Sequence, residues 1–272
     1  MAVTNVAFAA NQSDRTIPVR KITAEDLNFA LREGWNDFLE KRGDLIVAGL
    51  IYPLIGLITA AVTLGSRFLP LFYPVAAGIS LLGPIVAVGF YELARRREAG
   101  LESNWTHFFD VRKRPSAPGI VAVAGLLIAI FVGWIFAASL LFVTLWGGYV
   151  PTSIGDFATR LFTTGEGWAL IIVGNAVGAL FAALVLAVSL VSLPMLVDCT
   201  ISGHEAVSTS VRAFLANAGL MVRWGLTIAV LLLLGSIPLF IGLAVVLPVL
   251  GYATWHLYTR LIDRSALEIC KD

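Results

Sequence analysis

Three consecutive arginines end a long apolar run and belong to a dense polar cluster in the sequence. Arg95, Arg96 and Arg97 follow closely on Tyr91 and Glu92. Guanidinium groups gathered at one depth can bind an anionic lipid headgroup or an acidic loop of a partner protein. The alternative is structural, because long basic side chains at the end of a membrane helix reach the headgroups. Both interpretations place this segment at a membrane surface.

Residues suited to catalysis or metal binding are few. The chain has 3 histidines, and His204 stands beside Glu205. Together with Asp198 and His256 this pair offers metal-ligand chemistry, but the spacing is loose, and a His-Glu pair in a cap-like setting is more often structural. Walker, nucleophile-elbow and zinc-protease motifs are missing from the sequence. We therefore expect no catalytic residue, no metal site, no cofactor and no enzymatic activity.

A few polar side chains interrupt the apolar runs near their middle. Asn175, Ser189 and Ser192 could line the path of a neutral or amphipathic solute. Gly174 and Gly178 form a Gly-x-x-x-Gly pair in the same region, which favours close helix packing over a substrate path. No acidic or basic residue lies near the centre of a run, as the path of a charged solute would require.

Aromatic residues recur in three segments that each precede an apolar run. Apolar residues at helical spacing in the first and last of these segments predict amphipathic helices on the membrane surface. The aromatic candidates for lipid or partner binding in the three segments are Trp35, Phe38, Trp105, Phe108 and Phe214.

The composition identifies the elements that must position these residues. Hydrophobic residues make up 58% of the 272 residues and charged residues only 14%. The uncharged runs cover 45–66, 68–91, 115–155, 167–197 and 224–259. Each is long enough to cross a bilayer, and the last is long enough for two helices that bend at 235–238, the segment GSIP. The sequence thus predicts an all-α polytopic membrane protein with six transmembrane helices as three hairpins, each preceded by a cytoplasmic amphipathic interfacial helix.

The distribution of basic residues orients these spans. Of the 19 lysines and arginines, 17 fall in the two termini and the loops on one side, and 2, Arg67 and Arg160, fall on the other. The positive-inside rule therefore predicts cytoplasmic N- and C-termini. No cleavable secretory signal is visible, so the first span is expected to serve as an uncleaved insertion signal. The net charge of +1 gives no indication of nucleic-acid binding.

The three predicted hairpins resemble one another and suggest a parallel internal repeat. The units would cover 23–94, 100–198 and 202–262 within a single membrane domain, 23–265, flanked by a flexible N-terminal segment, 1–22, and a tail, 266–272. A chance similarity among aromatic-rich amphipathic helices is the alternative. TAED from Thr23 and SGHE from Ser202 resemble helix-capping boxes.

Two further local features complete the expectations. The outer loop contains SIGDFATRLFTTG, in which Asp156 and Arg160 have the i,i+4 spacing of a short interfacial helix. The two cysteines, Cys199 and Cys270, are too few and too far apart to predict a disulfide framework or a thiolate metal site.

Several segments resemble a known family. GFYELARRREAG, preceded by LLGP, together with REGWNDF and the stretch from PMLVD to SVRAFLAN, is similar to bacterial integral membrane proteins of the family called domain of unknown function 2189. The resemblance extends over residues 20 to 265. It implies an integral membrane protein without an established activity, and some members have been labelled components of cytochrome c oxidase. A haem–copper catalytic subunit needs about half a dozen buried histidines, more than this chain has.

These observations favour a non-enzymatic accessory protein of the bacterial inner membrane. It would bind a partner membrane complex, which the family labels suggest is respiratory, or anionic lipid headgroups, through the arginine cluster and the aromatic helices. The alternative is a small transporter or channel for a neutral or amphipathic solute.

Overall fold

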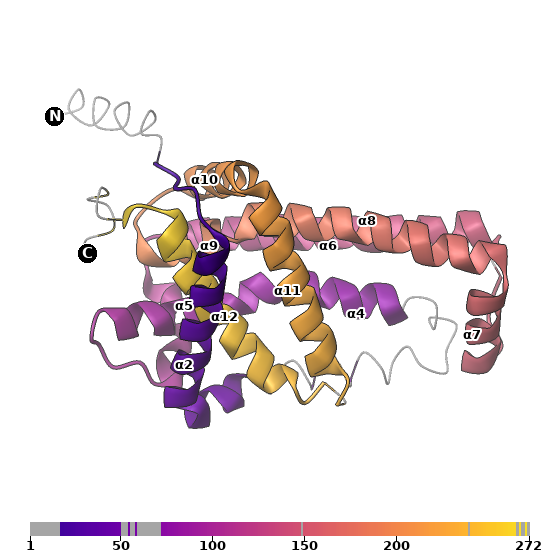
Figure 1. Ribbon diagram of the computed structural model, residues 1–272, viewed down its shortest axis with the longest axis horizontal. Coiled ribbons are helices and arrows are strands. Elements are labelled where there is room, and N and C mark those ends of the chain that lie inside the picture. Colours follow the sequence, from indigo (N-terminus) through magenta and orange to yellow (C-terminus); the bar gives the residue numbers. More distant parts are fainter. Residues whose placement is uncertain are drawn as a thin grey trace.

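The computed structural model describes four stretches of the chain and a few single positions. The stretches are 17–49, 72–147, 149–238 and 240–264, and the single positions are Leu54, Ile58, Leu267 and Cys270. Nearly all of this part of the chain is helical (Figure 1). The all-α prediction is confirmed.

The helices follow one another along the chain with short connections. Their order is α2 (Ala24–Gly49), α4 (Phe72–Leu81), α5 (Gly83–Glu98), the 3-10 helix η2 (Trp105–Lys113), α6 (Ala117–Trp146), α7 (Ile154–Thr163), α8 (Gly165–Ser189), α9 (Ser192–Asp198), α10 (Gly203–Ala216), α11 (Ala218–Ser236) and α12 (Leu243–Leu261).

Among the described helices, α2 and α12 make the most extensive contact with each other. Gly34 of α2 lies so close to α12 that a Cβ atom there would stand 2.6 Å from the backbone nitrogen of Ala253. On the same face of α2, Leu27 and Ala30 are buried. Helix α2 is therefore packed into the helical body along this face, and its other face is exposed.

Helices α6 and α8 run side by side along the longest axis, with α7 across their far end (Figure 1). Helix α6 ends at Trp146 and is followed by Gly147, whose φ of 60° is the left-handed conformation that glycine adopts without strain. Ser153 caps α7 and Thr164 caps α8, each by accepting a hydrogen bond from a backbone N–H in the first turn. The short helix expected in the outer loop is confirmed.

The uncharged runs 68–91 and 224–259 are each divided into separate helices. The run 68–91 contains α4 and the first part of α5, which meet at Leu82, and Pro84 lies in the first turn of α5. The run 224–259 breaks where expected, because α11 ends at Ser236 and α12 begins at Leu243. Proline cannot donate the backbone hydrogen bond that would continue a helix, which accounts for a break at each place.

Three helical segments in the described part of the chain are long and apolar enough to cross a membrane. They are Ala117–Trp146, Gly165–Asp198, which joins α8 to α9, and Ala218–Ser236. Most of the first predicted span, 45–66, lies outside the described residues. The six-span hairpin arrangement and the interfacial position of the amphipathic helices therefore stay predictions. A membrane-integral protein with apolar helices is what the fold supports.

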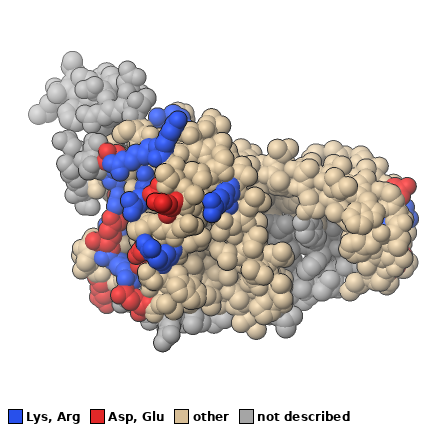
Figure 2. All heavy atoms as spheres, in the orientation of Figure 1, with Lys and Arg blue, Asp and Glu red and all other residues tan. Residues whose placement is uncertain are grey.

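Charged side chains gather at one end of the molecule (Figure 2). This charged end lies over α2, α5 and the segments near both described termini, and a smaller charged group lies at α7. The long flanks of α6 and α8 between them carry exposed apolar side chains such as Phe136 and Leu180, each 71% exposed. Apolar flanks between two polar ends match the profile of a bilayer.

Candidate functional site

The side chains of the arginine cluster bind acidic and polar groups within the protein. Tyr91 and Glu92, which precede the arginines, are both buried. Arg95 donates to the carboxylate of Glu92 at 2.8 Å, and Arg96 donates to the carbonyl oxygen of Glu102 at 2.6 Å. The sequence could not show that these guanidinium groups have partners inside the fold.

The third arginine connects α5 to α2 and, through a shared carboxylate, to α12. Arg97 lies 3.3 Å from Asp37 and also pairs with Glu40. Asp37 is buried, and its second oxygen lies 2.8 Å from Nε2 of His256. One carboxylate thus holds three helices together, an arrangement that sequence spacing could not reveal because its members are far apart in the chain.

Helix η2 lies against α5 and carries its own ion-pair group. Asn104 caps η2, and Asp110 accepts from Lys113 at 2.5 Å and contacts Nδ1 of His107 at 2.6 Å. The hydrogen bond from Lys113, followed by that from His107, lowers the pKa of Asp110 to about 2. Asp110 therefore stays ionised at neutral pH, and it also lies 3.8 Å from a guanidinium nitrogen of Arg96.

An apolar groove lies between α5, η2 and the start of α6. Its volume is about 310 Å³, and its lining is Ile85, Val86, Val88, Gly89, Phe108, Phe109, Val111 and Ile120. A Cβ atom at Gly89 would stand 2.4 Å from the ring of Phe108, so only glycine lets η2 approach α5 this closely. The groove was not predicted, because three separate segments must meet to form it.

The five aromatic candidates divide into buried and exposed residues. Phe38 and Phe108 are buried, and Phe214 is partly buried against the core. Trp35 on α2 and Trp105 on η2 are each 46% exposed. The exposed pair has the amphipathic character expected at a membrane interface.

The polar residues suggested for a solute path do not face a common space. Asn175 is exposed on α8, and its amide donates to the carbonyl of Ile171 at 2.8 Å. Ser189 and Ser192 are buried, and each donates to the backbone carbonyl four residues earlier. These three side chains therefore donate hydrogen bonds to backbone carbonyls of the same helical segment.

The glycine pair on α8 is engaged in packing at one of its two positions. A Cβ atom at Gly178 would stand 3.2 Å from the ring of Trp134 on α6. A Cβ atom at Gly174 would meet nothing within 4 Å. The close packing expected from the motif is thus made by Gly178 within this chain.

A polar group joins the ends of α5, α9 and α12. Arg264 pairs with Glu98 and lies 3.4 Å from Asp198, whose carboxylate accepts a 2.9 Å hydrogen bond from Tyr258. Trp255 donates to Glu98 at 3.0 Å. Burial would raise the pKa of Glu98, but the hydrogen bond and charge of Arg264 outweigh it and lower that pKa. We call these five residues the C-terminal polar cluster.

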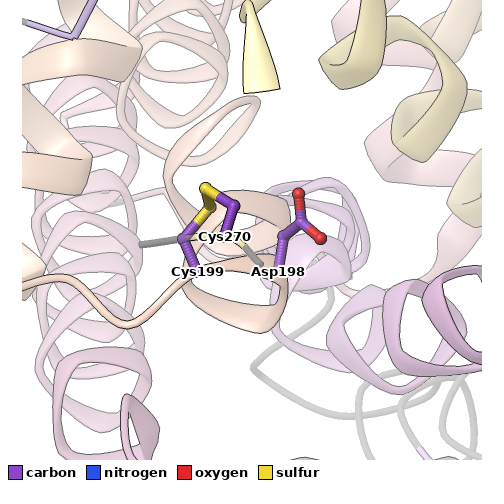
Figure 3. A group of neighbouring side chains, drawn as sticks. All are labelled: Asp198, Cys199 and Cys270. Atoms are coloured by element: carbon purple, nitrogen blue, oxygen red, sulfur yellow. A yellow bond between two sulfur atoms is a disulfide. The ribbon is translucent and has the colours of Figure 1, made fainter. Parts of the chain in front are cut away.

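Beside this cluster the two cysteines are joined, which corrects the expectation from their number and spacing. Cys199 and Cys270 form a disulfide across 71 residues of chain (Figure 3). Sequence separation was the wrong criterion, because Cys270 lies beside Cys199 at the end of α9. With Asp198 the two sulfur atoms make a group of candidate metal ligands within 4.8 Å, although sulfurs bonded to each other offer no thiolates.

The histidine and carboxylate residues considered for a metal site serve separate structures. His204 is exposed, and Ser202 caps α10 by accepting from the backbone N–H of Glu205. Burial raises the pKa of Glu205. His256 belongs to the ion-pair group on α2, and Asp198 belongs to the C-terminal polar cluster. Among the described residues these groups do not converge.

Comparison with known families finds a match in the middle of the chain. The sequence pattern of domain of unknown function 2189, described as a predicted integral membrane protein, matches residues 72–198. The chain resembles this family. The match to domain of unknown function 2189 covers α4 to α9, and so includes the arginines, η2 and the groove, whereas REGWNDF and SVRAFLAN lie outside it. No curated protein and no solved structure matches significantly.

Proposed function

We propose that the protein is a non-enzymatic accessory protein of the bacterial inner membrane that binds an anionic phospholipid at its charged end. Membrane integration supports this proposal, and the basic residues near both termini favour a cytoplasmic position for that end. The observation that carries the proposal is the apolar groove between α5, η2 and α6.

The groove has the chemistry of an acyl-chain site. All of its lining residues are apolar, and Phe109, which is 53% exposed, extends this surface outwards. Arg112 directly follows the lining residue Val111, is exposed, and has no ion-pair partner among the residues that the structure describes. A phospholipid that places an acyl chain in the groove and its phosphate near Arg112 matches both the apolar lining and the basic side chain.

The paired arginines support this site indirectly. Arg96 links α5 to η2 through Asp110, and Arg97 links α5 to α2. These ion pairs fix the walls of the groove, while Arg112 supplies the charge that meets a headgroup. Transport through the bundle receives no comparable support, because Asn175 is exposed on α8.

The test is native mass spectrometry of the full chain released from nanodiscs that contain phosphatidylglycerol or phosphatidylcholine. We expect retained phosphatidylglycerol, with about fivefold weaker binding in Arg112→Ala, since one basic residue near a membrane surface contributes about 1 kcal/mol. Val86→Phe fills the groove and should reduce retention of both lipids.

Matched controls separate this site from general effects. Arg32→Ala removes an exposed arginine on α2, and Val132→Phe enlarges an exposed side chain on α6, so neither should alter lipid retention. Equal retention by wild type, Arg112→Ala and Val86→Phe would contradict the lipid proposal. A membrane complex that co-purifies stoichiometrically and occupies the groove instead would favour the partner-binding form of the accessory function.

A further inference from the structure

The cysteine pair lies at the end of the molecule where a permanent disulfide is least expected. The charged end faces the cytoplasm in the proposed orientation, and cytoplasmic thiols are normally kept reduced by glutathione and thioredoxin systems. Cytoplasmic disulfides in mesophiles are usually transient. A bond between Cys199 and Cys270 at this end therefore implies a reversible role.

The two sulfur atoms differ in access. Cys199 is 1% exposed and follows the last residue of α9, whereas Cys270 is partly buried on the chain beyond α12. A small disulfide can therefore reach Cys270 first. Cys199 is placed to attack the mixed disulfide from within the protein, as a resolving thiol does.

The disulfide holds Cys270 beside Asp198 of the C-terminal polar cluster. Arg264 lies between Cys199 and Cys270 in the closed loop and contacts both Glu98 and Asp198. Cys199 also lies 3.7 Å from the hydroxyl of Tyr258, which donates to Asp198. When the disulfide is reduced, only ion pairs and packing hold these residues together.

We propose that Cys199 and Cys270 form a reversible thiol–disulfide site that takes low-molecular-weight disulfides of the glutathione class. The thiolate of Cys270 attacks one sulfur of the small disulfide and releases one small thiolate. The thiolate of Cys199 then attacks the Cys270 sulfur and releases the second. Two protein thiols and one small disulfide thus become one protein disulfide and two small thiols, with the thiol protons passing to the released thiolates.

The first experiment measures the redox state of the full chain in native membranes. Membranes are equilibrated with mixtures of reduced and oxidised glutathione, and free thiols are then labelled with a maleimide polymer that shifts the protein on a gel. We expect two labels in reduced mixtures, none in oxidised mixtures, and full return after reversal. A disulfide that stays closed in a cytosol-like reduced mixture, or thiols that never form one, would overturn the proposal.

The second experiment measures the consequence for the chain beyond α12. Trypsin cleavage after Arg264 should be severalfold slower in the oxidised protein than in the reduced protein. Cys270→Ser should be cleaved quickly in both mixtures, and it leaves the buried Cys199 in place in case Cys199→Ser folds poorly. Equal cleavage of oxidised and reduced wild type would show that the disulfide does not hold this segment, and would contradict its role as a switch.

Measuring the zinc content of the reduced protein tests whether the same thiols bind a metal instead. If the reduced protein retains zinc stoichiometrically and then resists oxidation by glutathione disulfide, the group with Asp198 is a metal site and the redox proposal is wrong. Lipid retention by Arg112→Ala is independent of this outcome, so the two proposals fail separately.

Discussion

At the scale of single residues, Asp37 shows how one buried carboxylate can hold several helices. It pairs with Arg97 on α5 and contacts His256 on α12, while its own helix is α2. Removing one member of a buried ion pair leaves the others without compensation, which typically costs about 3–5 kcal/mol. Arg97 is 30% exposed, and the lower end of this range therefore applies.

Asp37→Ala should reduce the free energy of unfolding by about 3 kcal/mol. Glu40→Ala is the matched control, because Glu40 pairs with the same arginine but is 64% exposed. Exposed pairs contribute about 0–1 kcal/mol. Thermal unfolding in detergent measures both variants, and equal losses would show that Asp37 is not the main connection.

Asp110 gives a prediction for the pH dependence of stability. Its pKa is lowered from 3.8 to about 2 in the folded protein, so its carboxylate favours folding above pH 3.8. This stabilisation is lost as the pH falls from 3.8 towards 2. Thermal unfolding of wild type and Asp110→Asn should therefore differ most above this window and converge within it. Glu25→Gln, which removes an exposed carboxylate on α2, should not show this convergence.

Charged residues were predictable from the sequence, but their partners were not. The three adjacent arginines and the capping motif SGHE can be recognised in the amino-acid sequence, and Ser202 indeed caps α10. The contact between Asp37 and His256 joins positions 219 residues apart, and the disulfide joins positions 71 apart. Such contacts depend on how helices pack, which local composition does not encode.

At the scale of helices, α2 and α12 approach each other closely at Gly34. Gly34→Ala places a methyl group 2.6 Å from the backbone nitrogen of Ala253, so the two helices must separate. We expect the free energy of unfolding to fall by about 1–3 kcal/mol, the range for overpacking a core.

Gly174→Ala is the control for this substitution. A Cβ atom there meets nothing within 4 Å, and alanine favours a helix over glycine by about 1 kcal/mol. Thermal unfolding should show opposite shifts for the two variants. A destabilised Gly174→Ala would mean that Gly174 packs against something other than this chain.

The elements were predictable where proline, glycine and caps interrupt a pattern. The break before α12, the short helix α7 and the Ser202 cap follow from local signals. The division between α4 and α5 lies within one uncharged run, whose length predicted a single span. The second aromatic segment is the 3-10 helix η2, and its contact with α5 depends on Gly89.

At the scale of the whole molecule, the charge distribution predicts orientation. The charged end and α7 lie at opposite ends of the long axis (Figures 1 and 2). In a cysteine-free background, Leu101→Cys should react with a membrane-impermeant maleimide only from the cytoplasmic side, and Phe162→Cys only from the opposite side. Both native residues are more than half exposed, so access does not limit the reaction. Labelling of both positions from the same side would contradict the orientation.

The length of α6 has a consequence for the membrane that surrounds it. Its 30 residues extend about 45 Å, whereas the hydrocarbon core of a bilayer is about 30 Å thick. A helix with this hydrophobic mismatch must tilt or thicken the lipid around it. Because α8 packs along α6 and α7 packs against α8, the helices tilt together, and bilayer thickness then sets the angle of the charged end relative to the membrane surface.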